Sequence, residues 1–138
     1  MNFILPNYIY RVKEIVRVID GDTVDVIIDL GFYLNSLKRV RMIDLDTDEM
    51  RGGTIETKQR ANMAKDRLEQ LLSFGNVYIQ TQMDKTGKYG RLLGKFFIVK
   101  DSSVIDVNGT LIEEGYQKGG IGTVFTEKVK SFPLTENK

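Results

Sequence analysis

The stretch Arg41-Met-Ile-Asp-Leu-Asp-Thr-Asp-Glu49 stands between a strand-like pattern and a helical one, and it holds one arginine and four carboxylates. Carboxylates crowded in this way repel one another unless a cation or an arginine offsets their charge. The stretch therefore predicts a metal site, a phosphate site or both. The simpler alternative is a solvated acidic turn after a strand, and the rest of the chain has to decide between the two.

Three strand patterns lead up to this acidic stretch. Residues 8–19 alternate apolar and polar side chains, Asp20-Gly21 interrupts them, and Thr23–Ile28 resumes the alternation. Residues 30–36, with a glycine and an asparagine, are interpreted as a second turn, and residues 37–43 as a third strand. The pattern predicts antiparallel strands joined by turns.

The parity of the third strand constrains the site. Arg41 and Asp46 are an odd number of residues apart, so they would face opposite sides of one continuous strand. They converge only if the strand ends near Ile43 or Asp44 and the following loop curls back over the face that carries Arg41. In that arrangement we expect Asp44 and Asp48 to be solvated rather than to bind a metal.

After the acidic stretch the periodicity becomes helical. Thr54 is the predicted N-cap, and apolar residues recur at helical spacing as far as Leu72. The later segments are strands at 77–83 and 92–99, a polar loop at 84–90 and a short helix at 108–117. This order predicts an α+β fold: a five-stranded Greek-key β-barrel of the oligonucleotide-binding (OB) type, with one long helix after strand 3 and a short helix after strand 5.

Composition narrows the chemistry. The chain of 138 residues predicts a single domain over 1–138, with a core at about 8–120 and a C-terminal tail at 121–138. It contains no cysteine and no histidine, which excludes thiol and imidazole catalysis. Neither a signal-peptide pattern nor a membrane-spanning stretch is evident, so we expect a cytoplasmic monomer without a membrane partner, although secretion by another route stays open.

Three short motifs together resemble the staphylococcal nuclease (thermonuclease) family. They are Ile-Asp-Gly-Asp-Thr-Val at 19–24, the acidic stretch at 41–49, and Lys-Tyr-Gly-Arg at 88–91, in the family's order and approximate spacing. The resemblance covers roughly residues 12–118. It implies an OB barrel with a calcium-dependent phosphodiesterase site, which hydrolyses DNA and RNA with little sequence preference and favours single strands.

The resemblance also implies a metal site. The metal-binding aspartates correspond to Asp22 and Asp46, and the carbonyl ligand corresponds to Thr47. An all-oxygen, partly hydrated site of this kind suits Ca²⁺. Glu49 corresponds to the catalytic glutamate, which would orient or deprotonate the water that attacks phosphorus in line.

Phosphate binding falls to two arginines in the same resemblance, Arg41 and Arg91. The planar guanidinium binds two phosphate oxygens at once and keeps its charge. Lys88 adds positive charge nearby, and Tyr89 either packs against a nucleotide or braces its loop. We assign both to substrate binding.

The chain departs from the family in places. Asp48 stands where the family commonly has a proline, and Ile121 and Thr123 replace the tyrosines of the nucleotide pocket. The main alternative to an enzyme is therefore a catalytically inactive domain of this type that binds nucleic acid or protein. A barrel that binds oligosaccharide or protein without any metal is a third alternative.

Overall fold

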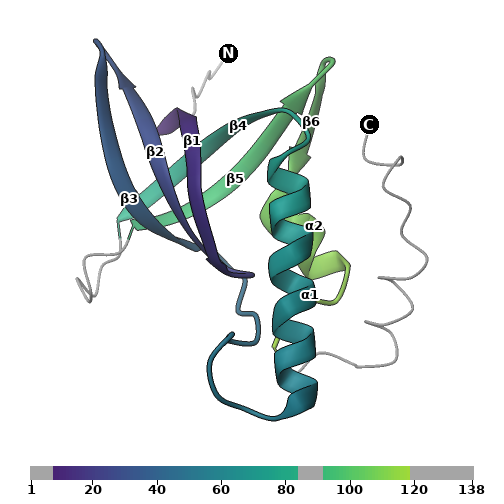
Figure 1. Cartoon of the computed structure of the whole chain (residues 1–138). Coiled ribbons are helices and arrows are strands. Elements are labelled where there is room, and N and C mark those ends of the chain that lie inside the picture. The colour runs from purple at the N-terminus through teal and green to yellow at the C-terminus, as the bar shows by residue number, and fades with distance from the viewer. Residues whose placement is uncertain (1–7, 84–91, 119–138) are drawn as a thin grey trace.

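The computed structural model describes residues 8–83 and 92–118, which form a β-barrel flanked by two helices (Figure 1). The strands are β1 (Ile9–Asp20), β2 (Thr23–Gly31), β3 (Leu34–Met42), β4 (Asn76–Met83), β5 (Leu92–Lys100) and β6 (Ser103–Asp106). The helices are α1 (Ile55–Leu72) and α2 (Val107–Glu113). No helix within these residues has the length and apolar character needed to cross a membrane.

Pairing between β3 and β5 closes the barrel. The strand order is β3-β2-β1-β4-β5-β6, and β3 also pairs with β5 in parallel, with Val40 opposite Leu92 and Met42 opposite Gly94. A Cβ atom at Gly94 would lie 2.8 Å from the Cδ1 atom of Ile79 and 3.0 Å from the Cγ1 atom of Val40. A glycine is therefore needed where the strands close, and the predicted five-stranded OB barrel is confirmed.

The core fills the barrel and extends beneath α1. Alternate residues of β2 and β3 point inward, so Val24, Val26 and Val40 are fully buried. One face of α1 packs on this core, and β1 ends beside that helix (Figure 1). Thr54 caps α1 as predicted, because its Oγ1 atom accepts a hydrogen bond from the backbone N–H of Thr57 at 3.2 Å.

The turn predicted at residues 30–36 is wrong in extent. The β2–β3 ladder continues through the pair Asp29–Asn35, so the turn consists only of Phe32 and Tyr33. Gly31 and Asn35 are turn formers by composition, but here they lie within the ladder. Both turn residues have a left-handed backbone, with φ of 54° and 64°.

Two further differences lie after β5. The short strand β6, which pairs with β5, was not predicted, because four residues that end in an aspartate carry little periodicity. The helix predicted at 108–117 runs from Val107 to Glu113. Its N-cap is Asp106, whose side chain accepts a hydrogen bond from the backbone N–H of Gly109 at 3.0 Å.

Candidate functional site

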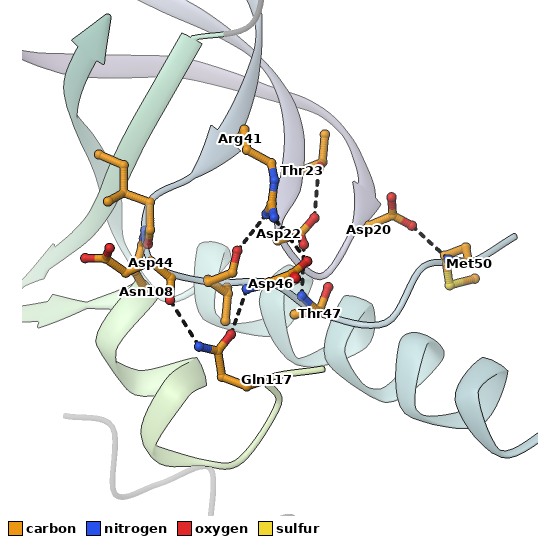
Figure 2. Close-up of polar contacts among 12 residues, drawn as sticks. Asp20, Asp22, Thr23, Arg41, Asp44, Asp46, Thr47, Met50, Asn108 and Gln117 are labelled. Atoms are coloured by element: carbon orange, nitrogen blue, oxygen red, sulfur yellow. Dashed lines mark hydrogen bonds and ion pairs between the residues drawn. The ribbon is translucent and has the colours of Figure 1, made fainter. Parts of the chain in front are cut away.

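Arg41 joins the two aspartates on which the predicted site depends (Figure 2). Its Nη1 atom lies 2.7 Å from Oδ2 of Asp22, and its Nη2 atom lies 3.2 Å from Oδ1 of Asp46. Nη1 also donates to the backbone carbonyl of Leu45 at 2.6 Å. The guanidinium therefore offsets two carboxylates, one from the turn between β1 and β2 and one from the acidic stretch itself.

Asp22 is the fixed member of this pair. It lies in the turn between β1 and β2 and is buried. Its carboxylate accepts hydrogen bonds from the Thr23 hydroxyl at 2.8 Å and from the Thr47 backbone N–H at 2.9 Å. Asp46, in contrast, has a side chain that is 68% exposed. One carboxylate is thus held rigidly at the barrel wall, while the other faces solvent.

The chain reverses between Arg41 and Asp46 as the parity argument predicts. Strand β3 ends at Met42, the Ile43 N–H donates to the Gly94 carbonyl at 2.9 Å, and Asp44 adopts φ of 62°. An aspartate tolerates this left-handed conformation better than most residues. The turn at Asp44 brings Asp46 back to the face of the sheet that carries Arg41, and Asp44 is exposed, as expected.

One residue at the start of α2 and one beyond its end hold this loop in place. The amide of buried Asn108 donates to the carbonyls of Ile43 and Gly94, at 2.9 and 3.1 Å. Gln117 accepts from the Asp46 N–H at 2.7 Å and donates to the Asp44 carbonyl at 3.2 Å (Figure 2). Sequence reasoning missed both residues, because a single amide in a short helix or beyond it forms no pattern.

Thr47 lies beneath the loop, in full burial. A Cβ atom at Gly21 would lie 3.0 Å from its Oγ1 atom and 2.6 Å from Cβ of Ala64, so only glycine lets the β1–β2 turn approach Thr47 and α1 this closely. Within the described residues the Thr47 hydroxyl has no hydrogen-bond partner. Its backbone N–H binds Asp22, which places Thr47 in the same cluster as the two aspartates.

Asp48 corrects an expectation. It is buried rather than solvated, and its Oδ2 atom lies 3.0 Å from Nε of Arg60 on α1. The burial follows from this partner, which is twelve residues away and not evident from the acidic stretch. Asp48 therefore ties the loop to the helix. Asp20 adds a second tie, because its carboxylate accepts from the Met50 N–H at 3.0 Å.

The remaining predicted residues are not joined to this cluster by a described contact. Glu49 is exposed, one residue after buried Asp48. Lys88, Tyr89 and Arg91 lie outside the described residues. The structure therefore brings together Asp22, Arg41, Asp46 and Thr47, and it leaves the other four as predictions.

The donor set at this cluster fits a hard cation. Asp22 and Asp46 offer carboxylate oxygens and Thr47 offers a backbone carbonyl, which are the ligands that Ca²⁺ prefers, with water completing the shell. Among the described residues no group of three acidic, histidine or cysteine side chains is close enough to bind a metal alone. A cation here would thus depend on two carboxylates, backbone oxygen and water.

The next ion pair on the same face of β3 involves Arg39. Its Nε and Nη2 atoms donate to the two carboxylate oxygens of Asp25 on β2, at 2.8 and 3.0 Å. Hydrogen bonding from Arg39 holds the pKa of Asp25 below its ordinary value. Asp25 thus occupies the two parallel donors of Arg39 that could otherwise bind a phosphate.

Comparison with known proteins identifies the family of this chain. The family model described as "Staphylococcal nuclease homologue" matches residues 39–134, which is more than half of the chain. Protein ParB of Escherichia coli is 29% identical over 107 residues, a match that covers 74% of this chain and 53% of that protein. The chain thus spans about half the length of this curated relative. On the family match and the closed barrel, the chain belongs to the staphylococcal nuclease family.

Proposed function

We propose that this protein is a Ca²⁺-dependent nuclease that hydrolyses phosphodiester bonds in DNA and RNA with little sequence preference. The observation that supports this most directly is the placement of the Arg41 guanidinium between Asp22 and Asp46. A phosphate-binding group and two hard oxygen ligands thereby share one edge of the barrel. This is the combination that phosphodiester hydrolysis without histidine requires.

Arg41 retains donors for a phosphate. Of the five N–H groups of its guanidinium, the described contacts use two on Nη1 and one on Nη2. The Nε–H and one Nη2–H remain, and these can bind two oxygens of a phosphate together. The acceptors at Asp22 and Leu45 meanwhile fix the side chain, so the donors are oriented before substrate arrives.

The other predicted site residues would bind the metal, activate water and bind the substrate. Asp22, Asp46 and the Thr47 carbonyl would hold Ca²⁺, which supplies positive charge for the phosphoryl oxygens and lowers the pKa of bound water. Glu49, exposed beside this cluster, would orient or deprotonate the attacking water. Arg91 would bind the phosphate, with Lys88 and Tyr89 contacting the nucleotide. Single-stranded DNA and RNA are the expected substrates.

The decisive experiment is hydrolysis of single-stranded DNA and RNA by the purified protein over a calcium titration and in EGTA. We expect cleavage that requires calcium. Cleavage that persists in EGTA would contradict the metal-assisted mechanism. Binding of the oligonucleotide without cleavage at any calcium concentration would support the alternative of an inactive nucleic-acid-binding domain.

A lysine at position 41 tests the phosphate-binding role. Arg41→Lys keeps the charge but loses the planar fork, so we expect turnover to fall by about a thousandfold, as when a phosphate-stabilising arginine is removed. Arg39→Lys is the matched control, because Arg39 lies two residues away on the same face of β3 and is paired with Asp25. Equal loss in both variants would show a general electrostatic effect rather than a specific one.

A further inference from the structure

The turn between β2 and β3 presents two aromatic rings to solvent. Phe32 is 93% exposed and Tyr33 is fully exposed. Both have a left-handed backbone, with φ of 54° and 64°, a conformation that bulky L-residues rarely adopt. Asn-Gly or Asp-Gly would meet the same geometry more easily. The two large rings are therefore not stabilised by burial, and the backbone conformation of the turn does not favour them either.

A second turn in the same protein shows that the geometry does not require aromatic residues. Asp101 and Ser102 join β5 to β6 and also have left-handed φ values, of 48° and 69°. Both are small polar residues, which is the usual chemistry of such turns. The two hairpins thus share a backbone conformation and differ in what they present to solvent.

The aromatic turn borders a basic hollow. This hollow, of about 800 Å³, is lined by Phe32, Tyr33, Arg11, Lys13 and Asp29, together with Gly31 and Asn35. Asp29 is already used in the turn, because its carboxylate accepts a hydrogen bond from the Gly31 N–H at 2.9 Å. Neither Arg11 nor Lys13 forms an ion pair with any other described residue. Two cations therefore stand beside two exposed rings.

One face of β3 connects this hollow to the candidate site. Alternate residues of a strand share a face, so Arg41, Arg39, Leu37 and Asn35 follow one another on the side opposite to buried Val40. From Arg41 to Tyr33 the chain covers about 26 Å, at roughly 3.3 Å per residue. Single-stranded nucleic acid occupies about 4–16 nucleotides on one OB barrel, which is enough to span this length.

We propose that Phe32, Tyr33, Arg11 and Lys13 form a second binding site for single-stranded nucleic acid, at the opposite end of β2 and β3 from the candidate catalytic site. Bases stack on the two rings, and phosphates lie against the two cations. The proposal builds on the proposed function, because it takes the nuclease's own substrate as the ligand. The amide of Asn35 along the path favours a ligand with hydrogen-bonding groups over a lipid surface.

Binding in EGTA tests the site without cleavage. The ligand is a fluorescent oligothymidylate of about 16 nucleotides, measured by anisotropy with the full chain. In the double variant Phe32→Asn/Tyr33→Gly we expect the Kd to rise at least about tenfold, because stacking is abolished while the turn keeps a sequence that suits it. Phe32→Tyr/Tyr33→Phe retains both rings and should bind normally. Asp101→Asn/Ser102→Gly is the matched control at the other hairpin.

The charged part of the site has its own readout. Removing both cations in Arg11→Gln/Lys13→Gln should reduce the slope of log Kd against log salt by about 0.7 for each phosphate that the protein no longer neutralises. Lys100→Gln removes an exposed cation beside the β5–β6 turn and should leave the slope unchanged. In cleavage assays, Phe32→Asn/Tyr33→Gly should raise KM for long substrates and leave KM for a dinucleotide substrate unchanged.

The outcomes separate this proposal from the proposed function. Suppose that Phe32→Asn/Tyr33→Gly binds oligothymidylate more weakly and that the wild-type protein cleaves nothing in calcium. This result supports the second site and contradicts the nuclease. Calcium-dependent cleavage with unchanged Kd and KM in that variant does the reverse. If the variant instead loses binding to phosphatidylserine vesicles, or changes from dimer to monomer on gel filtration, with DNA affinity unaltered, the second nucleic-acid site is wrong.

Discussion

Gln117 holds the exposed aspartate of the site through the backbone at Asp44 and Asp46. Its amide accepts from the Asp46 N–H and donates to the Asp44 carbonyl, at 2.7 and 3.2 Å. The backbone N–H of Lys118 adds a hydrogen bond to the Asp46 carbonyl at 2.6 Å. Asp46 thus owes its position to two residues from a distant part of the chain. Under the proposed function they would act as the groups behind a metal-binding carboxylate.

Gln117→Ala tests this positioning role. We expect the calcium concentration for half-maximal cleavage to rise about 10- to 100-fold, while the rate at saturating calcium falls less, because the variant loosens a ligand and leaves Arg41 in place. Lys118→Ala is the matched control, since Lys118 contacts Asp46 through its backbone. A fall in rate at saturating calcium with no change in calcium dependence would contradict the assignment.

Contacts between residues close in sequence could be predicted, whereas contacts between distant residues could not. Parity along β3 showed that Arg41 and Asp46 could meet only if the strand ended near Ile43 or Asp44. Strand β3 ends at Met42, and the two side chains lie 3.2 Å apart. Gln117 binds a residue 71 positions earlier, and nothing local to either residue indicates that contact. Arg91 was assigned by resemblance alone and stays a prediction.

Among the elements, the acidic loop and α1 are connected by the ion pair of buried Asp48 with partly exposed Arg60. We expect Asp48→Asn to lower the free energy of unfolding by about 1–3 kcal/mol, because it weakens a charge-assisted hydrogen bond in a buried position. Urea unfolding measures this effect. Asp44→Asn, in the same loop but exposed, should change stability by less than about 0.5 kcal/mol. A similar small effect for both would mean that the pair contributes nothing net.

In the β2–β3 turn we expect a double substitution to increase stability. Phe32→Asn/Tyr33→Gly should raise the free energy of unfolding by about 1–2 kcal/mol, because asparagine and glycine adopt left-handed φ values with less strain. Asp101→Asn/Ser102→Gly should gain less, since an aspartate already tolerates the conformation. A lower free energy of unfolding for Phe32→Asn/Tyr33→Gly would show that the two rings pack against the protein in solution.

Element types were largely predictable and element limits were not. Alternation and helical spacing identified β1 to β5 and both helices, because each has a face buried in one core. The turn at 30–36 was drawn too wide because glycine and asparagine indicate a turn whether or not strands continue through them. The β2–β3 pairing extends as far as Asp29 and Asn35 because the two strands already lie side by side. Local residue preferences do not indicate how far such pairing continues.

For the molecule as a whole, an ion pair joins the two helices. Arg67 on α1 donates to both carboxylate oxygens of Glu114, at 2.8 and 2.9 Å, and both side chains are buried. Tyr116 lies in the same region and is also buried. Burial, with a smaller contribution from the charge of Glu114, raises the pKa of Tyr116 to about 12.

This shift predicts how global stability depends on alkaline pH. Because the pKa of Tyr116 is higher in the folded state than its ordinary 10.0, its contribution is complete below pH 10 and is lost as pH rises toward 12. We expect the wild-type melting temperature to fall more steeply over that interval than that of Tyr116→Phe. Parallel curves for the two proteins would contradict the shift.

The contact between Gln117 and Asp46 also determines when the site can form. A segment made early in translation is secured by a residue made 71 positions later, and closing so long a loop is entropically expensive and slow. While the chain is still being synthesised, β1 to β3 can pair before the acidic loop is fixed. The backbone at Asp46 is therefore fixed only after residue 117 has been synthesised, which is later than the pairing of β1 to β3.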